Sequence, residues 1–167
     1  MMKFTFATLL LLFATILATA QNEKLTTFIL LRHAEKVTDG TKDPDLNEAG
    51  MARAENLVSL FKNTTIEAIY STAFVRTRKT VEPLGKSKSL IVKEYEANKL
   101  EAIDKMLQAH EGKTILVCGH SNTIPKIANH LSKKGNYKDF DDADYGNILI
   151  VTVSAKRKSA SVTWLHY

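Results

Sequence analysis

Two histidines of this chain stand where an apolar run gives way to polar residues. His33 follows Arg32 and the run Phe28-Ile29-Leu30-Leu31, and His120 follows Gly119 and the run 114–118. Each run has the length and apolar character of a strand in a parallel sheet that is covered on both faces. Ligands of open α/β sheets bind beyond the carboxyl ends of the strands, so we expect both histidines to lie in a site there.

A third apolar run, 66–71, also ends at polar residues and is followed closely by Arg76. If the three strand ends share one edge of the sheet, two arginines and two imidazoles converge on one pocket. Arg32 and Arg76 would hold phosphate oxygens bidentately. One neutral imidazole would attack phosphorus, and the second histidine would donate to a phosphate oxygen. Asn122, at the start of the following helix, completes the predicted substrate-binding set together with the backbone N–H groups there.

Short apolar strands alternate with amphipathic helices along the chain, which predicts a mostly parallel sheet with helices on both faces. The expected strands cover 27–31, 66–71, 89–95 and 114–118. The expected helices cover 51–61 with Asn47 as N-cap, 74–84 ended by Pro83 and Gly85, 99–110, and 123–131. The runs 147–153 and 160–165 predict an antiparallel hairpin at or near one edge of the sheet. No linker or repeat divides the chain, so we expect one domain.

The first twenty residues have the pattern of a cleavable secretory signal peptide. Lys3 precedes an apolar run over 4–17, and Ala18-Thr19-Ala20 forms a small-residue cleavage site. The run is shorter than the about 20 residues of a membrane span. We therefore expect cleavage after Ala20, a single domain over 21–167, a secreted or periplasmic location, and no stable membrane anchor after cleavage.

Charge and cysteine content narrow the class of protein further. Loss of Lys3 with the leader lowers the formal charge from +5 to +4, and no basic stretch is interleaved with aromatic residues, which favours a small anionic substrate over nucleic acid. The single cysteine, Cys118, lies in an apolar run and is expected to be buried without a disulfide. His33 and His120 lack the spacing that supplies three metal ligands, so neither a metal nor a cofactor is expected.

Four segments in order resemble the motifs of the histidine phosphatase superfamily, branch 1, which includes the cofactor-dependent phosphoglycerate mutases. They are Leu31-Arg32-His33-Ala34-Glu35-Lys36, Asp43 to Gly50, Tyr70-Ser71 with Arg76 to Thr80, and Gly119 to Thr123. Ala34 replaces the family's glycine. The resemblance implies an α/β/α sandwich, a phosphohistidine formed on His33, and phosphate binding by Arg32, Arg76 and His120.

The resemblance also implies a carboxylic acid that protonates the leaving alcohol, and three residues compete for this role. We expect Glu96, which is closest to the end of its strand. Glu94 lies two residues earlier, so on a strand both would point to the same face. Asp144, before the hairpin, is the third candidate. Glu35 and Lys36 either contact the substrate or form a solvated pair.

The chain is short for this family and has few segments that could enclose the site, which favours hydrolysis over phosphoryl return to a product. We therefore expect a metal-independent phosphatase that acts on phosphomonoesters outside the cytoplasm. One alternative is a phosphohistidine phosphatase acting on a phosphoprotein. The other is a non-catalytic phosphate-binding protein that lacks a working acid. The segment Gly119-His120-Ser121 lacks the Gly-x-Ser-x-Gly elbow of a serine hydrolase.

Overall fold

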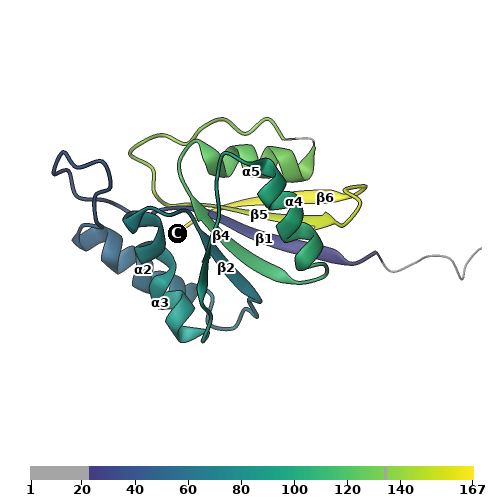
Figure 1. Cartoon of the computed structure of the whole chain (residues 1–167), viewed down its shortest axis with the longest axis horizontal. Helices are drawn as coiled ribbons and strands as arrows, with labels where there is room; N and C mark the ends of the chain where they lie inside the picture. The colour runs from purple at the N-terminus through teal and green to yellow at the C-terminus, as the bar shows by residue number, and fades with distance from the viewer. Residues whose placement is uncertain (1–22, 134) are drawn as a thin grey trace, which may run out of the picture.

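The computed structural model describes residues 23–133 and 135–167. The predicted signal peptide, 1–20, lies outside the described residues, so its cleavage remains a prediction. The strands are β1 Leu25–Arg32, β2 Ala68–Ser71, β3 Val92–Glu94, β4 Thr114–Gly119, β5 Asn147–Ser154 and β6 Ala160–His166. The helices are α2 Glu48–Leu60, α3 Val75–Ser87, α4 Leu100–Ala109 and α5 Thr123–Ser132 (Figure 1).

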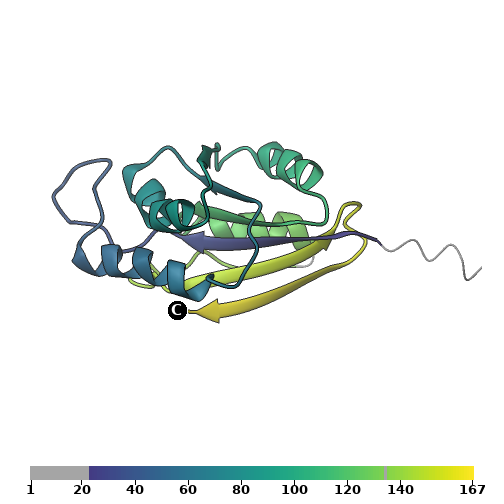
Figure 2. The same ribbon diagram turned by 90° about the horizontal axis from the view of Figure 1, so that it is seen from below.

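The six strands form one sheet in the order β3-β2-β4-β1-β5-β6. Strands β3, β2, β4 and β1 are parallel, whereas β5 is antiparallel to β1 and to β6. The hairpin formed by β5 and β6 lies at one edge, where Figure 2 shows its two strands side by side. The mostly parallel sheet with an antiparallel edge hairpin is confirmed.

Alternating side chains of the central strands bury two hydrophobic clusters, one on each face of the sheet. On β1, Phe28 and Leu30 pack with α4 and α5, whereas Ile29 and Leu31 pack with α2 and α3. Figure 1 shows the same division of the helices into two layers. This is the expected α/β/α sandwich, because a central parallel strand must cover both of its faces. Cys118 is fully buried, as predicted.

Two expected element boundaries were wrong. Helix α3 continues through Pro83 to Ser87, because tertiary packing outweighs local propensity. Its Gly85 lies against the carbonyl of Leu90, so the helix sits tightly on the segment that leads into β3. The strand expected over 89–95 forms only over Val92–Glu94, and this edge strand pairs with β2 alone.

The parallel strands place their carboxyl ends along one edge of the sheet. Arg32 of β1 pairs with Gly119 of β4, and Ser71 of β2 pairs with both Cys118 of β4 and Glu94 of β3. The residues that follow these strands therefore converge. No helix in the described part of the chain is long and apolar enough to cross a membrane.

Candidate active site

His33 is the first residue after β1, and its side chain is held in one orientation. Its backbone N–H donates to the carbonyl of Gly119 at 2.9 Å, which extends the β1–β4 ladder by one residue. Its ring Nδ1 lies 2.8 Å from the carbonyl oxygen of Ala34. A carbonyl oxygen only accepts, so Nδ1 carries the proton. In the neutral ring, Nε2 therefore carries the lone pair that a nucleophile needs.

The surroundings of His33 keep the imidazole neutral. Only 4% of the residue is exposed, and this burial lowers the pKa of His33 to about 3. The hydrogen bond to Ala34 opposes the shift, whereas the charges of Arg32 and Arg76 and the ring of His120 add to the lowering of the pKa. A neutral imidazole at ordinary pH is the nucleophilic form.

Arg32 ends β1 beside His33 and is almost fully buried. Its Nη1 donates to the carbonyls of Asp141 and Asp144, at 2.8 and 3.0 Å. Its Nη2 lies 3.7 Å from the carboxylate of Asp142, and the guanidinium stacks 4.1 Å from the ring centroid of Tyr145. Arg32 thus holds the loop before β5 at the site as well as placing a cation next to His33.

Arg76 comes from the first turn of α3, which follows β2. Its guanidinium stacks 4.3 Å from the ring centroid of Phe74, and Nη1 lies 3.4 Å from the carboxylate of Asp43. Nε of both Arg76 and Arg32 is buried without a hydrogen-bond partner in the described structure. The site therefore holds two arginine side chains whose donors are not all used within the protein.

His120 follows β4 and faces both Phe74 and His33. Its ring centroid lies 5.5 Å from that of His33 and 5.1 Å from that of Phe74. Its Nε2 is 3.1 Å from the hydroxyl of Thr72. Burial lowers the pKa of His120 to about 4, and Arg76 and Arg32 act in the same direction. Both histidines of the site are therefore neutral near pH 7.

A cavity of about 540 Å³ opens at this edge of the sheet, and five of the six predicted site residues line it. Its lining residues are Arg32, His33, Lys36, Arg76, His120, Ser121, Asn122, Asp139, Phe140 and Asp142. A second cavity of about 400 Å³ shares Arg76, His120 and Asn122 with it and extends toward the segment 94–98. The sixth predicted residue, Glu96, lines this second cavity.

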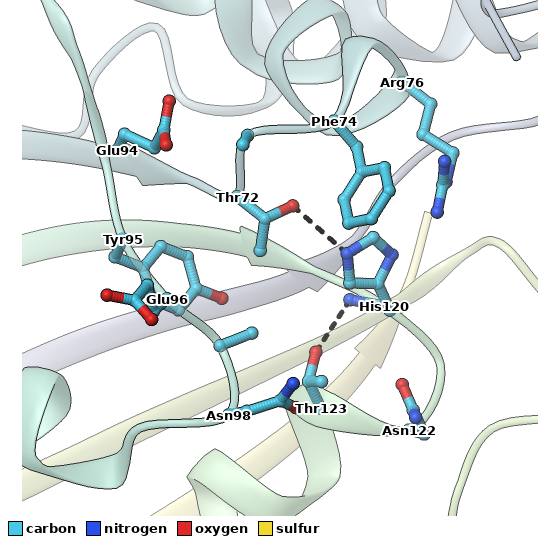
Figure 3. Close-up of a pocket in the computed structure, with 12 residues that line it drawn as sticks. Thr72, Phe74, Arg76, Glu94, Tyr95, Glu96, Asn98, His120, Asn122 and Thr123 are labelled. Atoms are coloured by element: carbon cyan, nitrogen blue, oxygen red, sulfur yellow. Dashed lines mark hydrogen bonds between the residues drawn. The ribbon is translucent and has the colours of Figure 1, made fainter. Parts of the chain in front are cut away.

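The three candidate acids differ in their surroundings. Glu94 and Glu96 both line the second cavity, on the side opposite Arg76 (Figure 3). The expectation that both lie on one strand was wrong, because β3 ends at Glu94. The side chain of Glu96 is 71% exposed and pairs with Lys99, whereas Glu94 makes no ion pair within residues 23–133 and 135–167. The Asp144 carboxylate instead accepts from Gly146 and bonds to His166.

Several residues that support the site were not predicted from the sequence. Thr80 of α3 accepts from the N–H of Ala34 at 2.9 Å and donates to the carbonyl of Arg76 at 2.7 Å. This fully buried hydroxyl ties the loop after the nucleophile to the turn that carries the second arginine. The recurrence of Thr77 and Thr80 at a spacing of three was the available sequence signal. The supporting residues Thr72, Asp43 and Tyr145 offered no comparable pattern.

Glu35 and Lys36, for which the sequence left two roles open, lie in different surroundings. Glu35 bonds to Arg53 through both carboxylate oxygens, and this pairing lowers the pKa of Glu35. Lys36 lines the larger cavity instead. Among the residues that the structure describes, no group of three His, Cys, Asp or Glu side chains is placed to hold a metal ion.

A comparison with known protein families gives a match over part of the chain. Residues 28–97, which contain β1, Arg32, His33, Arg76 and both candidate glutamates, match the model of the histidine phosphatase superfamily, branch 1. The resemblance predicted from the motifs is thereby confirmed. No match to a curated protein was found.

Solved structures of phosphatases share the whole histidine phosphatase fold. The protein histidine phosphatase SixA in complex with tungstate has a TM-score of 0.70 and 18% identity, over 84% of this chain and 96% of its own. A mycobacterial glucosyl-3-phosphoglycerate phosphatase has a TM-score of 0.69 and 11% identity, over 85% and 99%. YhfR of Bacillus stearothermophilus has a TM-score of 0.68 and 18% identity, over 83% and 95%. At these identities the likeness establishes the fold.

Proposed function

We propose that the protein is a metal-independent phosphatase that hydrolyses phosphomonoesters through a phosphohistidine intermediate on His33. The observation that carries the proposal is the buried imidazole of His33. Its proton is fixed on Nδ1 by the Ala34 carbonyl, and its ring lies beside Arg32, Arg76 and His120. The match of residues 28–97 to the histidine phosphatase superfamily supports a phosphatase.

In the first step, Nε2 of His33 attacks phosphorus and the bond from phosphorus to the alcohol oxygen breaks. The His33 ring becomes positively charged while its Nδ1–H still donates to the Ala34 carbonyl, which stabilises the cation. Arg32, Arg76 and His120 surround the three remaining phosphoryl oxygens and oppose their negative charge. Asn122, which lines both cavities, adds a neutral donor beside them.

The leaving alkoxide takes a proton from a carboxylic acid in the second cavity. We retain Glu96 as the predicted donor and propose Glu94 beside it, because Glu94 lines the same cavity and makes no ion pair among the described residues. In the second step, the carboxylate takes a proton from water, whose oxygen bonds to phosphorus. The bond between phosphorus and His33 then breaks, and inorganic phosphate leaves.

One observation favours a second candidate function, hydrolysis of phosphohistidine in a phosphoprotein. Both glutamates in the second cavity are exposed, whereas a carboxyl group tuned to donate a proton is usually buried. A P–N bond requires less help from such an acid, because an imidazole leaves as a neutral base once its ring is protonated. The fold shared with the protein histidine phosphatase SixA is consistent with this candidate.

We further propose that the protein acts outside the cytoplasm, either in the periplasm or after secretion. The proposal rests on the pattern Lys3, apolar 4–17 and Ala18-Thr19-Ala20. Mass spectrometry of the protein from a secreting host should give an N-terminus at Gln21. A full-length protein that stays in the cytoplasm would contradict the proposed location.

The decisive test of the function compares the wild-type protein with His33→Ala on an aryl phosphate in excess chelator. We expect turnover by the wild type and a loss of at least about 1,000-fold in the variant, because no other nucleophile replaces the imidazole. Full activity in His33→Ala would refute the mechanism, and a loss of activity with chelator alone would refute metal independence.

Two further measurements separate the alternatives. Phosphate binding without turnover of any phosphate ester or phosphohistidine would identify the non-catalytic binding protein. A phosphohistidine peptide and an alkyl phosphate should then be compared in Glu94→Gln and Glu96→Gln. Loss of turnover confined to the alkyl phosphate would identify the altered glutamate as the donor to an alcohol.

A further inference from the structure

Asp43 lies in the loop 37–46, between the nucleophile and α2, and lines neither cavity. Its carboxylate nevertheless contacts the turn that carries the second arginine. The backbone N–H of Val75 donates to both carboxylate oxygens, at 2.9 and 3.2 Å. Nη1 of Arg76 donates to Oδ1 at 3.4 Å. One carboxylate therefore binds both the start of α3 and the guanidinium of Arg76.

The carboxylate of Asp43 provides the side-chain cap at the start of α3. Phe74 occupies the N-cap position of α3 and makes no side-chain capping bond. Helix N-termini carry unpaired N–H groups and a partial positive charge, which a carboxylate satisfies. Asp43 supplies that carboxylate from a distant part of the sequence, so it fixes the turn from which Phe74 and Arg76 project.

Arg76 itself has few other restraints. Its side chain is 13% exposed, its guanidinium stacks on Phe74, and Asp43 is its only ion-pair partner among the described residues. In Figure 3, Phe74 and Arg76 both lie above His120. Without Asp43, the Arg76 guanidinium would keep its stacking contact with Phe74 but lose the hydrogen bond that fixes its direction.

We propose that Asp43 is a positioning residue of the phosphatase site, which holds Arg76 in the orientation that binds the phosphoryl group. This inference rests on the proposed function, because Arg76 must act on a phosphoryl group for its orientation to matter. Asp43 does not touch the substrate. It acts through Arg76 and through the first turn of α3.

The same loop provides a matched control. Asp45 lies two residues from Asp43 and pairs with Lys79 of the same helix, and both of these side chains are about half exposed. Asp45→Ala therefore removes a contact between the same loop and the same helix without touching Arg76 or the helix N-terminus. Asp43→Asn separates the effect of helix capping from that of the negative charge, because asparagine caps a helix as well as aspartate but carries no charge.

The experiment measures the dissociation constant of inorganic phosphate and the kcat and KM for an aryl phosphate in each variant. We expect Asp43→Ala to weaken phosphate binding about tenfold and to lower kcat/KM roughly 10- to 100-fold, as expected for a misplaced binding group. Asp43→Asn should fall between Asp43→Ala and the wild type. Asp45→Ala should remain within about twofold of the wild type.

Repeating Asp43→Ala in an Arg76→Ala background distinguishes positioning from general destabilisation. If Asp43 acts through Arg76, its removal there should change phosphate binding by less than about twofold. An equal loss in both backgrounds, or an equal loss in Asp45→Ala, would overturn the inference while the phosphatase assignment stands. A wild-type protein that neither binds phosphate nor turns over a phosphate ester would overturn the proposed function and this inference together.

Discussion

At the scale of single residues, the protonated nitrogen of each histidine decides what the site can do. The proton of His33 is fixed by a carbonyl, but the partner of His120 is the hydroxyl of Thr72, which can donate or accept. The Thr72 hydroxyl also lies 2.9 Å from that of Thr77, which donates to the carbonyl of Phe74 at 2.8 Å, so Thr77 and His120 both face the single Thr72 proton. In the arrangement where Thr72 donates to Nε2 of His120, the neutral ring carries its proton on Nδ1, which lies on the side of Arg76 in Figure 3 and can donate to a phosphoryl oxygen.

This arrangement makes Thr72 a residue whose hydroxyl matters more than its size. We expect Thr72→Val to lower kcat/KM roughly 10- to 100-fold, since the His120 ring loses the partner that fixes its tautomer and orientation. Thr72→Ser keeps the hydroxyl and should retain most of the activity. Steady-state kinetics on an aryl phosphate checks the pair, and a valine variant as active as the wild type would exclude this role for Thr72.

Site residues that belong to a strand end were predictable from the sequence, and residues that reach the site from elsewhere were not. His33, Arg32 and His120 follow directly from apolar runs, and parallel strands bring their ends to one edge of the sheet. Thr72 and Asp43 act through contacts with residues distant in sequence, His120 and the start of α3. No spacing within one element records such a contact, so their roles became visible only in the folded structure.

At the scale of elements, the close approach of α2 to the loop after the nucleophile sets the position of that loop. The N-cap prediction for Asn47 is confirmed, because its side chain accepts from the N–H of Gly50 at 2.9 Å. The backbone of Asn47 also donates to the carbonyl of Glu35 at 3.1 Å. A helix start and the loop that follows His33 therefore share one hydrogen-bond network, in which Gly50 lies against the carbonyl of Glu35.

A side chain at Gly50 should separate these two elements. A Cβ at this position would overlap the carbonyl oxygen of Glu35, and backbone cannot move aside cheaply. We expect Gly50→Ala to lower the free energy of unfolding by about 1–3 kcal/mol, the usual cost of overpacking, and to lower phosphatase activity as well. Ala49→Ser, at the exposed neighbouring position, is the control and should be near neutral. Urea denaturation compares the two, and equal stability would show that α2 does not hold this loop.

At the scale of the whole molecule, the carboxyl edge of the sheet gathers basic side chains, of which Arg32 and Arg76 pair with Asp142 and Asp43. Two arginines, the buried His33 and the partly buried His120 meet there, beyond a core that the two hydrophobic clusters stabilise. Bringing like charges together and removing them from water costs free energy. Keeping both imidazoles neutral reduces this cost, and an anion bound between the arginines would reduce it further. The site therefore links the stability of the fold to pH.

The expected direction of this linkage follows from His33. Its pKa is about 3 in the folded protein and 6.5 when exposed, so between these values the unfolded chain binds more protons. The contribution of a neutral His33 is fully present above about pH 6.5 and is lost as the pH falls toward 3, at no more than about 1.4 kcal/mol per pH unit. Arg32, Arg76 and His120 face this imidazole, and none supplies a negative charge that would offset its protonation.

We therefore expect the wild-type protein to lose stability on acidification faster than His33→Asn, whose side chain does not titrate. Urea denaturation at several pH values from 7 to 4.5, in phosphate-free buffer, should show the unfolding free energy of the wild type falling by roughly 2 kcal/mol more than that of His33→Asn. Carboxylates that titrate in this range are common to both proteins and cancel in the difference. Parallel curves would mean that the His33 imidazole accepts a proton as readily in the fold as in the unfolded chain. The surroundings of His33 in the fold would then not be what keeps this nucleophile neutral.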